Sequence, residues 1–404
     1  MRQAVVLVGG LGTRLGAFTQ STPKPLLQID EDRCFLDYLI EQLTRHGVSE
    51  IILIAGHLGE QVEARYGQSP PGCEVIVVRE PAPAGTAGAL QFARDLLDPV
   101  FLMMNGDSFF DVNLLALTST LAETDLAALA LRHVPDASRY GAVEHADGRV
   151  LAFREKQAAG GGAWISAGVY AVRRTILDHI STPPCSIEVD VFPALAAAGQ
   201  LAARPLEGYF IDIGLPDTLA QGRRELPQVR RRPAIIFGPD VAVQLDPLAS
   251  LHPAGMALTS EAVAAIRAAN DLGWFAVVAI DRPGPEPTGY LAEDVRRLQA
   301  NLQARLAPYG AHIDAIYHRD PQDSAAPGLA TDSPLRRDPD ADTLGAILRT
   351  LPIDAARSLL IYDQAADSAA AQALGLRTRA HAPGGLTGDV TAADLPAAAR
   401  LGAG

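Results

Sequence analysis

A glycine-rich segment near the start of the chain has the residue types of a phosphate-binding loop. It follows the apolar run Val5-Val6-Leu7-Val8 and consists of Gly9, Gly10, Leu11, Gly12, Thr13 and Arg14. Glycines let backbone N–H groups approach an anion without interference from a Cβ atom. Arg14 and Lys24, the latter in Pro23-Lys24-Pro25, add cations that suit phosphate oxygens. The spacing fits neither the Walker loop nor the dinucleotide GxGxxG pattern, so we predict a phosphate site of another type rather than a plain glycine turn.

Two acids occupy positions in or directly after apolar strands. Asp107 ends the segment Met103-Met104-Asn105-Gly106-Asp107, and Asp212 stands in Phe210-Ile211-Asp212-Ile213-Gly214. A buried carboxylate is costly unless it is paired or binds a metal. One such acid could be a satisfied structural residue, but two in a chain with a phosphate loop favour a metal. Because Mg²⁺ usually takes one or two carboxylates together with substrate phosphates and waters, we predict that Asp107 and Asp212 bind Mg²⁺.

A second tight segment begins at Glu80 and contains Gly85 and Thr86. It could hold a base or a ribose against its backbone. A carboxylate accepts hydrogen bonds, and the Watson–Crick edge of guanine offers two donors, so Glu80 favours a guanine nucleotide. The alternative is that Glu80 is an acid that interacts only with the dipole of a nearby helix N-terminus.

The predicted strands and helices that position these residues indicate an α/β fold. Strands are predicted at 3–8, 50–55, 74–78 and 100–104, and helices at 35–46, 58–66 and 87–97 alternate with them. This alternation predicts a mainly parallel sheet with helices on both faces. Ligands of such sheets lie beyond the carboxyl ends of the strands, where the glycine loop, the Glu80 segment and Asp107 all fall. Shorter strands between 126 and 172 predict a smaller mixed sheet that covers the substrate.

The length and composition of the chain limit what kind of protein it is. A chain of 404 residues is too long for one ordinary domain. The net charge of −13 argues against nucleic acid or an anionic membrane as the main partner. Three widely spaced cysteines, without a leader-like or membrane-spanning run, predict a cytoplasmic protein.

A basic, proline-punctuated run at 222–233 separates two α/β patterns. It could be a nucleic-acid patch, but an interdomain linker is the interpretation that we adopt. We therefore predict a first domain at 1–225, a linker at 226–233, a second α/β domain at 234–390 and a tail at 391–404.

Taken together, the segments of the first half resemble the sugar-1-phosphate nucleotidyltransferase family. The resemblance covers 3–225, and within the family it is greatest to the guanylyltransferases that act on D-glycero-D-manno-heptose 1-phosphate. The residues that carry it are Gly9 to Leu15, Pro23 to Pro25, Glu80 to Ala89, Asn105 to Asp107, Ser138 to Val143, Glu155-Lys156, Cys185 to Glu188 and Gly208 to Gly214. The resemblance implies a Rossmann-like fold and an in-line attack of a sugar 1-phosphate on the α-phosphorus of an NTP, GTP being favoured.

The same resemblance implies roles for individual residues. Arg14, Lys24 and Asp107 would be catalytic, and Mg²⁺ would bind Asp107 and Asp212. The sugar phosphate would bind at Gly141, Glu155, Lys156 and Ser166; Lys156 taken alone could equally be a solvated surface lysine. Ser166 stands where the family usually has Asn, so a sugar hydroxyl contact is expected to differ.

Residues 233–385 resemble the haloacid dehalogenase-like phosphatases, especially the heptose 1,7-bisphosphate phosphatases. Gly238 stands where that family has its nucleophilic Asp, while Asp240, Asp363 and Asp367 match other acids. Since glycine cannot attack phosphorus, we predict a phosphatase-like domain without phosphatase activity. Two alternatives remain open. One is a bifunctional enzyme with Asp240 or Asp246 as nucleophile, and the other is a non-catalytic nucleotide-sugar sensor. The sequence also leaves open whether the protein forms a homo-oligomer.

Overall fold

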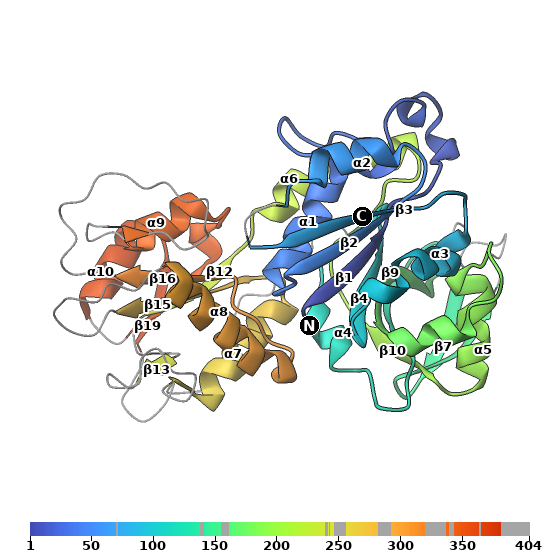
Figure 1. Cartoon of the computed structure of the whole chain (residues 1–404). Coiled ribbons are helices and arrows are strands. Elements are labelled where there is room, and N and C mark those ends of the chain that lie inside the picture. Colours follow the sequence, from blue (N-terminus) through green and yellow to red (C-terminus); the bar gives the residue numbers. More distant parts are fainter. Residues whose placement is uncertain are drawn as a thin grey trace. The chain divides into compact units, whose positions relative to one another are not determined.

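The first of two units, Met1–Pro227, is built on a nine-stranded sheet (Figure 1). The computed structural model describes residues 1–69, 72–137, 141–154, 161–238, 241, 243–245, 256–281, 292–319, 337–338, 343–362 and 365–380. The strands of the large sheet are β1 (Gln3–Leu7), β2 (Glu50–Ala55), β3 (Glu74–Arg79), β4 (Val100–Asn105), β6 (Ala127–Val134), β7 (Ala142–Ala146), β8 (Arg149–Arg154), β9 (Ala163–Arg173) and β10 (Leu201–Pro205). The strand order is β3-β2-β1-β4-β9-β6-β10-β8-β7.

The parallel part of this sheet is the part that the sequence predicted. Strands β3, β2, β1 and β4 pair in parallel, and β9 then runs antiparallel to β4. Strand β1 is buried on both faces, as expected of a parallel strand covered by helices. The expectation of a separate smaller sheet was wrong, because β6, β7, β8 and β9 continue the same sheet. Within the described part of this unit, only the short pair β5 (Ser108–Phe110) and β11 (Phe210–Asp212) stands apart from it.

The helices of the first unit are mostly short. They are η1 (Thr13–Thr19), η2 (Lys24–Leu26), α1 (Phe35–Arg45), α2 (Gly59–Tyr66), α3 (Gly85–Gly88), η3 (Ala89–Leu96), α4 (Leu114–Thr118), η4 (Arg174–His179), the π-helix η5 (Ile187–Val191), α5 (Phe192–Ala197) and α6 (Pro216–Arg230). Helix α1 follows the prediction, since it ends just before Gly47, which has φ of 79°. Helix α6 continues through Pro227 to Arg230, so 226–230 are helical where a linker was predicted.

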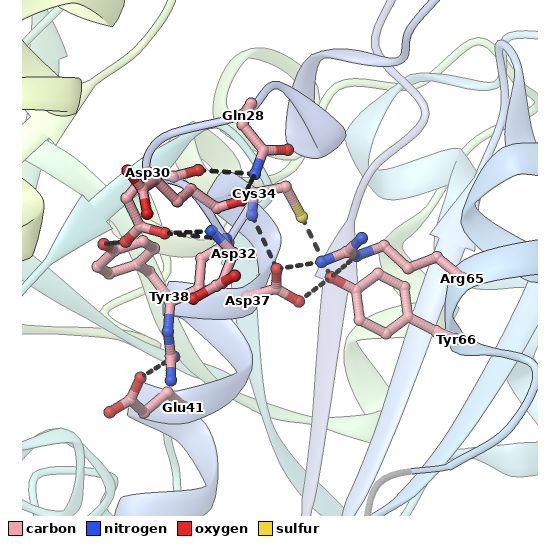
Figure 2. A network of polar contacts seen from close by, with 11 residues as sticks. Gln28, Asp30, Asp32, Cys34, Asp37, Tyr38, Glu41, Arg65 and Tyr66 are labelled. Carbon is pink, nitrogen blue, oxygen red and sulfur yellow. Dashed lines mark hydrogen bonds and ion pairs between the residues drawn. The ribbon is translucent and has the colours of Figure 1, made fainter.

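A polar network ties the start of α1 to the end of α2 (Figure 2). The Asp37 carboxylate accepts the backbone N–H of Cys34 at 2.8 Å, which satisfies one of the free donors at the helix N-terminus. It also accepts the Tyr66 hydroxyl and an Arg65 N–H, each at 2.6 Å. Burial raises the pKa of Tyr66 above its ordinary value, which keeps this hydroxyl a donor. The network fixes the position of helix α1 relative to helix α2.

The second unit, Gln228–Gly404, contains a six-stranded parallel sheet. Its order is β17 (Arg337–Asp338), β16 (Ala315–Arg319), β15 (Phe275–Asp281), β12 (Ala234–Phe237), β18 (Leu359–Tyr362) and β19 (Arg377–Ala380). A hairpin of β13 (Val243–Leu245) and β14 (Met256–Leu258) stands apart. The helices are α7 (Ser260–Asp271), α8 (Ala292–Leu306), η7 (Ala307–Tyr309), α9 (Thr343–Thr350), η8 (Ala355–Arg357) and α10 (Ala365–Ala373). The N-cap of α7 is Thr259, whose hydroxyl accepts the backbone N–H of Ala262.

The described helices of both units are too short or too polar to cross a lipid bilayer.

Candidate active site

The glycine loop follows β1 at its carboxyl end, and two of its glycines are required by the protein itself. A Cβ atom on Gly9 would collide with Oε2 of Glu80. Gly12 has φ of 61°, and a Cβ there would lie 2.9 Å from the Thr19 methyl group. Gly10 differs, because no described atom lies within 4 Å of the position its Cβ would take. The missing side chain at Gly10 therefore leaves room on the open side of the loop, where a ligand would bind.

The side chains that leave the loop point away from the core. Leu11 is 54% exposed, and Thr13 and Arg14 are also exposed, whereas Leu15 is buried and anchors η1. Buried Leu15 thus anchors the loop to the core, while the side chains of Leu11, Thr13 and Arg14 face solvent. This is the arrangement that an anion-binding loop needs, with its backbone held while its surface remains accessible.

Lys24 is the centre of the polar cluster beside this loop. Its side chain is 7% exposed, and its Nζ lies 2.7 Å from Oδ2 of Asp107 and 3.6 Å from Oδ1 of Asp212. Proline on either side restricts the backbone around Lys24. A buried ammonium between two carboxylates is well compensated, since a buried charge without a partner is very costly.

The short antiparallel pair of β5 and β11 brings the two acids together. Asp107 comes directly before β5, and Asp212 ends β11, where it pairs with Ser108. The backbone N–H of Ile213 donates to the carbonyl of Asp107 at 3.0 Å. Asp212 is held further by its own turn, in which Oδ1 accepts Gly214 N at 2.7 Å. Two acids far apart in the sequence therefore form one site.

Arg14 reaches the same place, as the surroundings of Gly214 show. A Cβ atom on Gly214 would lie 2.8 Å from Oδ1 of Asp212, 3.2 Å from Nη2 of Arg14 and 3.3 Å from Nζ of Lys24. All three polar groups therefore crowd around one glycine, and any side chain there would displace them. The structure brings together Arg14, Lys24, Asp107 and Asp212; their binding of a polyphosphate stays a prediction.

The residues of this cluster fit a magnesium ion that is held partly by its substrate. No group of three or more His, Cys, Asp or Glu side chains with metal-binding geometry occurs among the described residues. The site offers two carboxylates, those of Asp107 and Asp212, which both contact the Lys24 ammonium. The Asp107 side chain is 39% exposed. Mg²⁺ is commonly bound by one or two carboxylates, with phosphate oxygens and waters completing six ligands. Asp107 and Asp212 can supply that protein share.

The Glu80 segment lies against the glycine loop. Glu80 Oε1 accepts the backbone N–H of Ala84 at 2.5 Å, while Oε2 faces the backbone of Gly9 and Gly56. Glu80, the residue predicted to contact the nucleotide base, thus lies next to the glycine loop. One of its oxygens closes the turn of its own segment, and the second lies against the backbone of the glycine loop.

Gly85 and Thr86 fold onto a distant segment of the chain. Gly85 has φ of 76°, and a Cβ there would lie 2.5 Å from the carbonyl oxygen of Cys185. The Thr86 hydroxyl accepts the backbone N–H of Ile187 at 2.9 Å. The predicted nucleotide segment is therefore fastened to the segment that carries Glu188.

The sugar-side candidates are placed only in part. Ser166 is half-buried on β9, and Gly141 is exposed just before β7. Because β9 is antiparallel to β4 with Val169 opposite Met104, Ser166 lies past the carboxyl end of β4. Asp107 follows that same end. Glu155 and Lys156 lie outside the described residues.

The sequence reasoning gave no role to Tyr170 and named Glu188 only as part of the Cys185 to Glu188 segment. Tyr170 donates its hydroxyl to Oε1 of Glu188 at 2.5 Å, and its oxygen lies 3.1 Å from Oγ of Ser166. Burial, reinforced by the Glu188 carboxylate, raises the pKa of Tyr170 well above its ordinary value. A tyrosine in an apolar strand resembles a core residue in sequence, so only the acid in Cys185-Ser186-Ile187-Glu188 gave any signal.

Comparison with known proteins defines the class to which this fold and site belong. Residues 3–229, more than half of the chain, match the nucleotidyl transferase family, and the chain belongs to this family.

Particular relatives are guanylyltransferases of sugar 1-phosphates. The D-glycero-alpha-D-manno-heptose 1-phosphate guanylyltransferase of Aneurinibacillus thermoaerophilus is 33% identical over 228 residues, which are 55% of this chain and 98% of that protein. The mannose-1-phosphate guanylyltransferase catalytic subunit beta of Dictyostelium discoideum is 36% identical over 230 residues. That match covers 54% of this chain and 63% of the length of that relative.

Solved structures agree on the fold of the first unit. The crystal structure of HddC from Yersinia pseudotuberculosis superposes with a TM-score of 0.50 at 28% identity. The superposition covers 56% of this chain and 100% of HddC, and a second structure of HddC is complexed with GMP-PN. The first unit therefore has the fold of a sugar-1-phosphate guanylyltransferase-like nucleotidyltransferase.

Proposed function

We propose that the protein transfers a guanylyl group from GTP to a sugar 1-phosphate, releasing pyrophosphate and forming a GDP-sugar. D-glycero-D-manno-heptose 1-phosphate is the favoured acceptor, and mannose 1-phosphate is the next candidate. The observation that carries this proposal is the Lys24 ammonium between Asp107 and Asp212, with Arg14 beside it at the open glycine loop. The names of the relatives favour guanine and the two sugars.

The chemistry asks the protein chiefly to position two anions. An oxygen of the sugar phosphate attacks the α-phosphorus of GTP, and the bond from that phosphorus to the bridging oxygen of pyrophosphate breaks. The attacking phosphate is already ionised at neutral pH, so no general base is needed. Arg14 and Lys24 bind and neutralise phosphate oxygens, and the fixed position of Lys24 lowers the barrier because its charge needs little reorganisation during the reaction. Magnesium, held by Asp107 and Asp212, would neutralise further phosphate charge when bound.

Guanine recognition is assigned to Glu80. Its Oε2 faces the glycine loop, and a carboxylate can accept the ring N–H and the amino group of guanine. Adenine lacks this pair of donors and would leave Oε2 of Glu80 without them, which is a source of selectivity.

A substrate panel tests this function. The purified protein is incubated with Mg²⁺, each of GTP, ATP, UTP and dTTP, and one of three sugar 1-phosphates: D-glycero-D-manno-heptose, mannose or glucose. Pyrophosphate release is expected with GTP and one of the two manno-configured sugars. Binding of GDP-mannose without pyrophosphate release under any combination would indicate a sensor and contradict the proposal. Turnover with only UTP or dTTP would contradict the role of Glu80.

The second unit is proposed to be a haloacid dehalogenase-like domain without phosphatase activity. Strand β12 is central in its sheet, with β15 on one side and the later strand β18 on the other. The strand order therefore reverses at β12, and ligands of such sheets bind at the carboxyl ends of the strands at this point. Gly238 occupies that end, is buried, and donates its N–H to the carbonyl of Ile361 at 2.8 Å. A Cβ there would lie 3.2 Å from the same oxygen. Asp240, Asp246 and Asp363 lie outside the described residues.

Phosphate release from D-glycero-D-manno-heptose 1,7-bisphosphate with Mg²⁺ tests this part. We expect no release above that of an Asp240→Asn variant, because Gly238 offers no nucleophile. Release that disappears in Asp240→Asn would show instead that the protein is bifunctional.

A further inference from the structure

A chain of three polar groups runs from the sugar side of the site into the core of the first unit. The Ser166 Oγ lies 3.1 Å from the Tyr170 oxygen, and Tyr170 is fully buried. The Tyr170 hydroxyl in turn lies 2.5 Å from Oε1 of Glu188. A buried tyrosine can satisfy its hydroxyl with one partner. The additional contact with the half-buried Ser166 therefore points to a role beyond packing.

The irregular course of β9 makes this chain possible. Residues four apart in a regular strand are about 13 Å apart along it. Here the register against β6 shifts, with Ser166 opposite Leu131 and Tyr170 opposite Leu129. Gly168 lies between them with φ of 73°, and a Cβ there would collide with the side chain of Asn105. A bulge of this kind re-aims a side chain, and here it brings the two hydroxyls together.

The direction of each hydrogen bond follows from counting protons. Glu188 as a carboxylate can only accept, so the single proton of Tyr170 is donated to it. The Tyr170 oxygen is then an acceptor, and the Ser166 hydroxyl donates its own proton to it. Ser166 is left with lone pairs only, of which one meets the Gly168 N–H at a long 3.5 Å. The other lone pair can accept a hydrogen bond from a substrate hydroxyl.

The position of the chain connects both substrate sites. Ser166 lies past the carboxyl end of β4, beside the segment that leads to Asp107. Glu188 belongs to the π-helix η5, whose first residue, Ile187, donates to the Thr86 hydroxyl of the predicted nucleotide segment. Single π-turns of this kind are frequent at functional sites.

We propose that Tyr170 and Glu188 are positioning residues that hold Ser166 as a hydrogen-bond acceptor for one hydroxyl of the sugar ring. This inference rests on the proposed function, and it assigns specificity to a chain of residues rather than to Ser166 alone. Asn at this position would offer both a donor and an acceptor, whereas Ser166 in this setting offers only an acceptor. The site therefore selects a sugar with a hydroxyl, and not merely an acceptor atom, at that position.

Variants of the chain test this inference in steady-state kinetics with GTP and mannose 1-phosphate or D-glycero-D-manno-heptose 1-phosphate. In Tyr170→Phe and Glu188→Ala, Ser166 is no longer held in one orientation as an acceptor, so KM for the sugar should rise about tenfold, or about 1.4 kcal/mol. KM for GTP should change by less than about twofold. A general disturbance of the fold would instead raise KM for GTP and KM for the sugar together. The matched control is Tyr66→Phe (Figure 2), which removes a tyrosine hydroxyl donated to Asp37 at 2.6 Å in the same unit. Equal effects of Tyr170→Phe and Tyr66→Phe on KM for the sugar would overturn the inference.

Fluorinated sugars give a second measurement. Fluorine accepts but does not donate, so one of the 2-, 3- and 4-deoxyfluoro mannose 1-phosphates should bind the native protein poorly. The same analogue should lose its disadvantage in Ser166→Ala. If all three analogues behave alike in both proteins, Ser166 accepts no sugar hydroxyl. Failure of the native protein to turn over any sugar would instead contradict the proposed function itself.

Discussion

An Asp107→Asn protein is expected to release pyrophosphate at least about 10³-fold more slowly than the native protein while it keeps its fold. The substitution is nearly isosteric, and Asp107 is 39% exposed, so the core does not change. It removes one of the two carboxylates available to a metal and one of the two acids that hold Lys24. Neutral Asn can still contact Lys24, but it is a much weaker magnesium ligand.

The control for this experiment is Asp178→Asn, which removes an exposed carboxylate from the same unit. It should leave kcat and KM unchanged. Matching circular dichroism and melting temperatures for the two variants would show that the loss in Asp107→Asn is chemical. Near-native turnover in Asp107→Asn would mean that the catalytic centre lies elsewhere.

Lys24→Met is expected to slow turnover by about 10²- to 10³-fold and also to lower stability by about 1–3 kcal/mol. Methionine fills a similar volume without the charge, so the two carboxylates lose the cation that they share. The chain has 34 lysines and arginines, and in its sequence only Lys24 and Lys156 are lysines. Nearly all other basic residues of the chain are arginines. The choice of lysine at position 24 agrees with a need for a compact point charge at this buried position.

Magnesium gives this variant a second readout. Because a divalent cation can take over the compensation of two unpaired carboxylates, Mg²⁺ should raise the melting temperature of Lys24→Met more than that of the native protein. The matched control is Arg2→Met, since Arg2 also joins two acids, Glu50 at 2.7 Å and Asp98 at 2.6 Å. A larger magnesium effect in Arg2→Met than in Lys24→Met would count against a metal site at Asp107 and Asp212.

The sequence singled out Arg14, Lys24, Asp107 and Asp212 because these residues and the glycines beside them depart from the local pattern. Asp107 and Asp212 are acids next to apolar stretches of sequence, and the Gly9 to Gly12 segment interrupts a helix-strand pattern with three glycines. Such breaks are expected at functional sites. The parallel strands β1 to β4 were also predicted, since continuous apolar runs that alternate with helices are typical of a parallel sheet covered on both faces.

What the sequence could not supply was the pairing between distant segments. Local alternation shows that β6 to β9 are strands, but it does not say that they extend the large sheet. The three-residue strand β5 is too short to detect, yet its pairing with β11 joins the two acids. Tyr170 has the sequence setting of a core residue, because the contacts of its hydroxyl with Ser166 and Glu188 join segments that the local sequence does not pair.

The most direct test of the proposed catalytic centre is a crystal structure of the protein with a non-hydrolysable GTP analogue and Mn²⁺ in place of magnesium. Anomalous scattering would locate the ion. We expect it within about 2–2.5 Å of carboxylate oxygens of Asp107 and Asp212, with the triphosphate on the loop from Gly9 to Arg14. An ion distant from both acids, or a triphosphate bound in the second unit, would contradict this assignment.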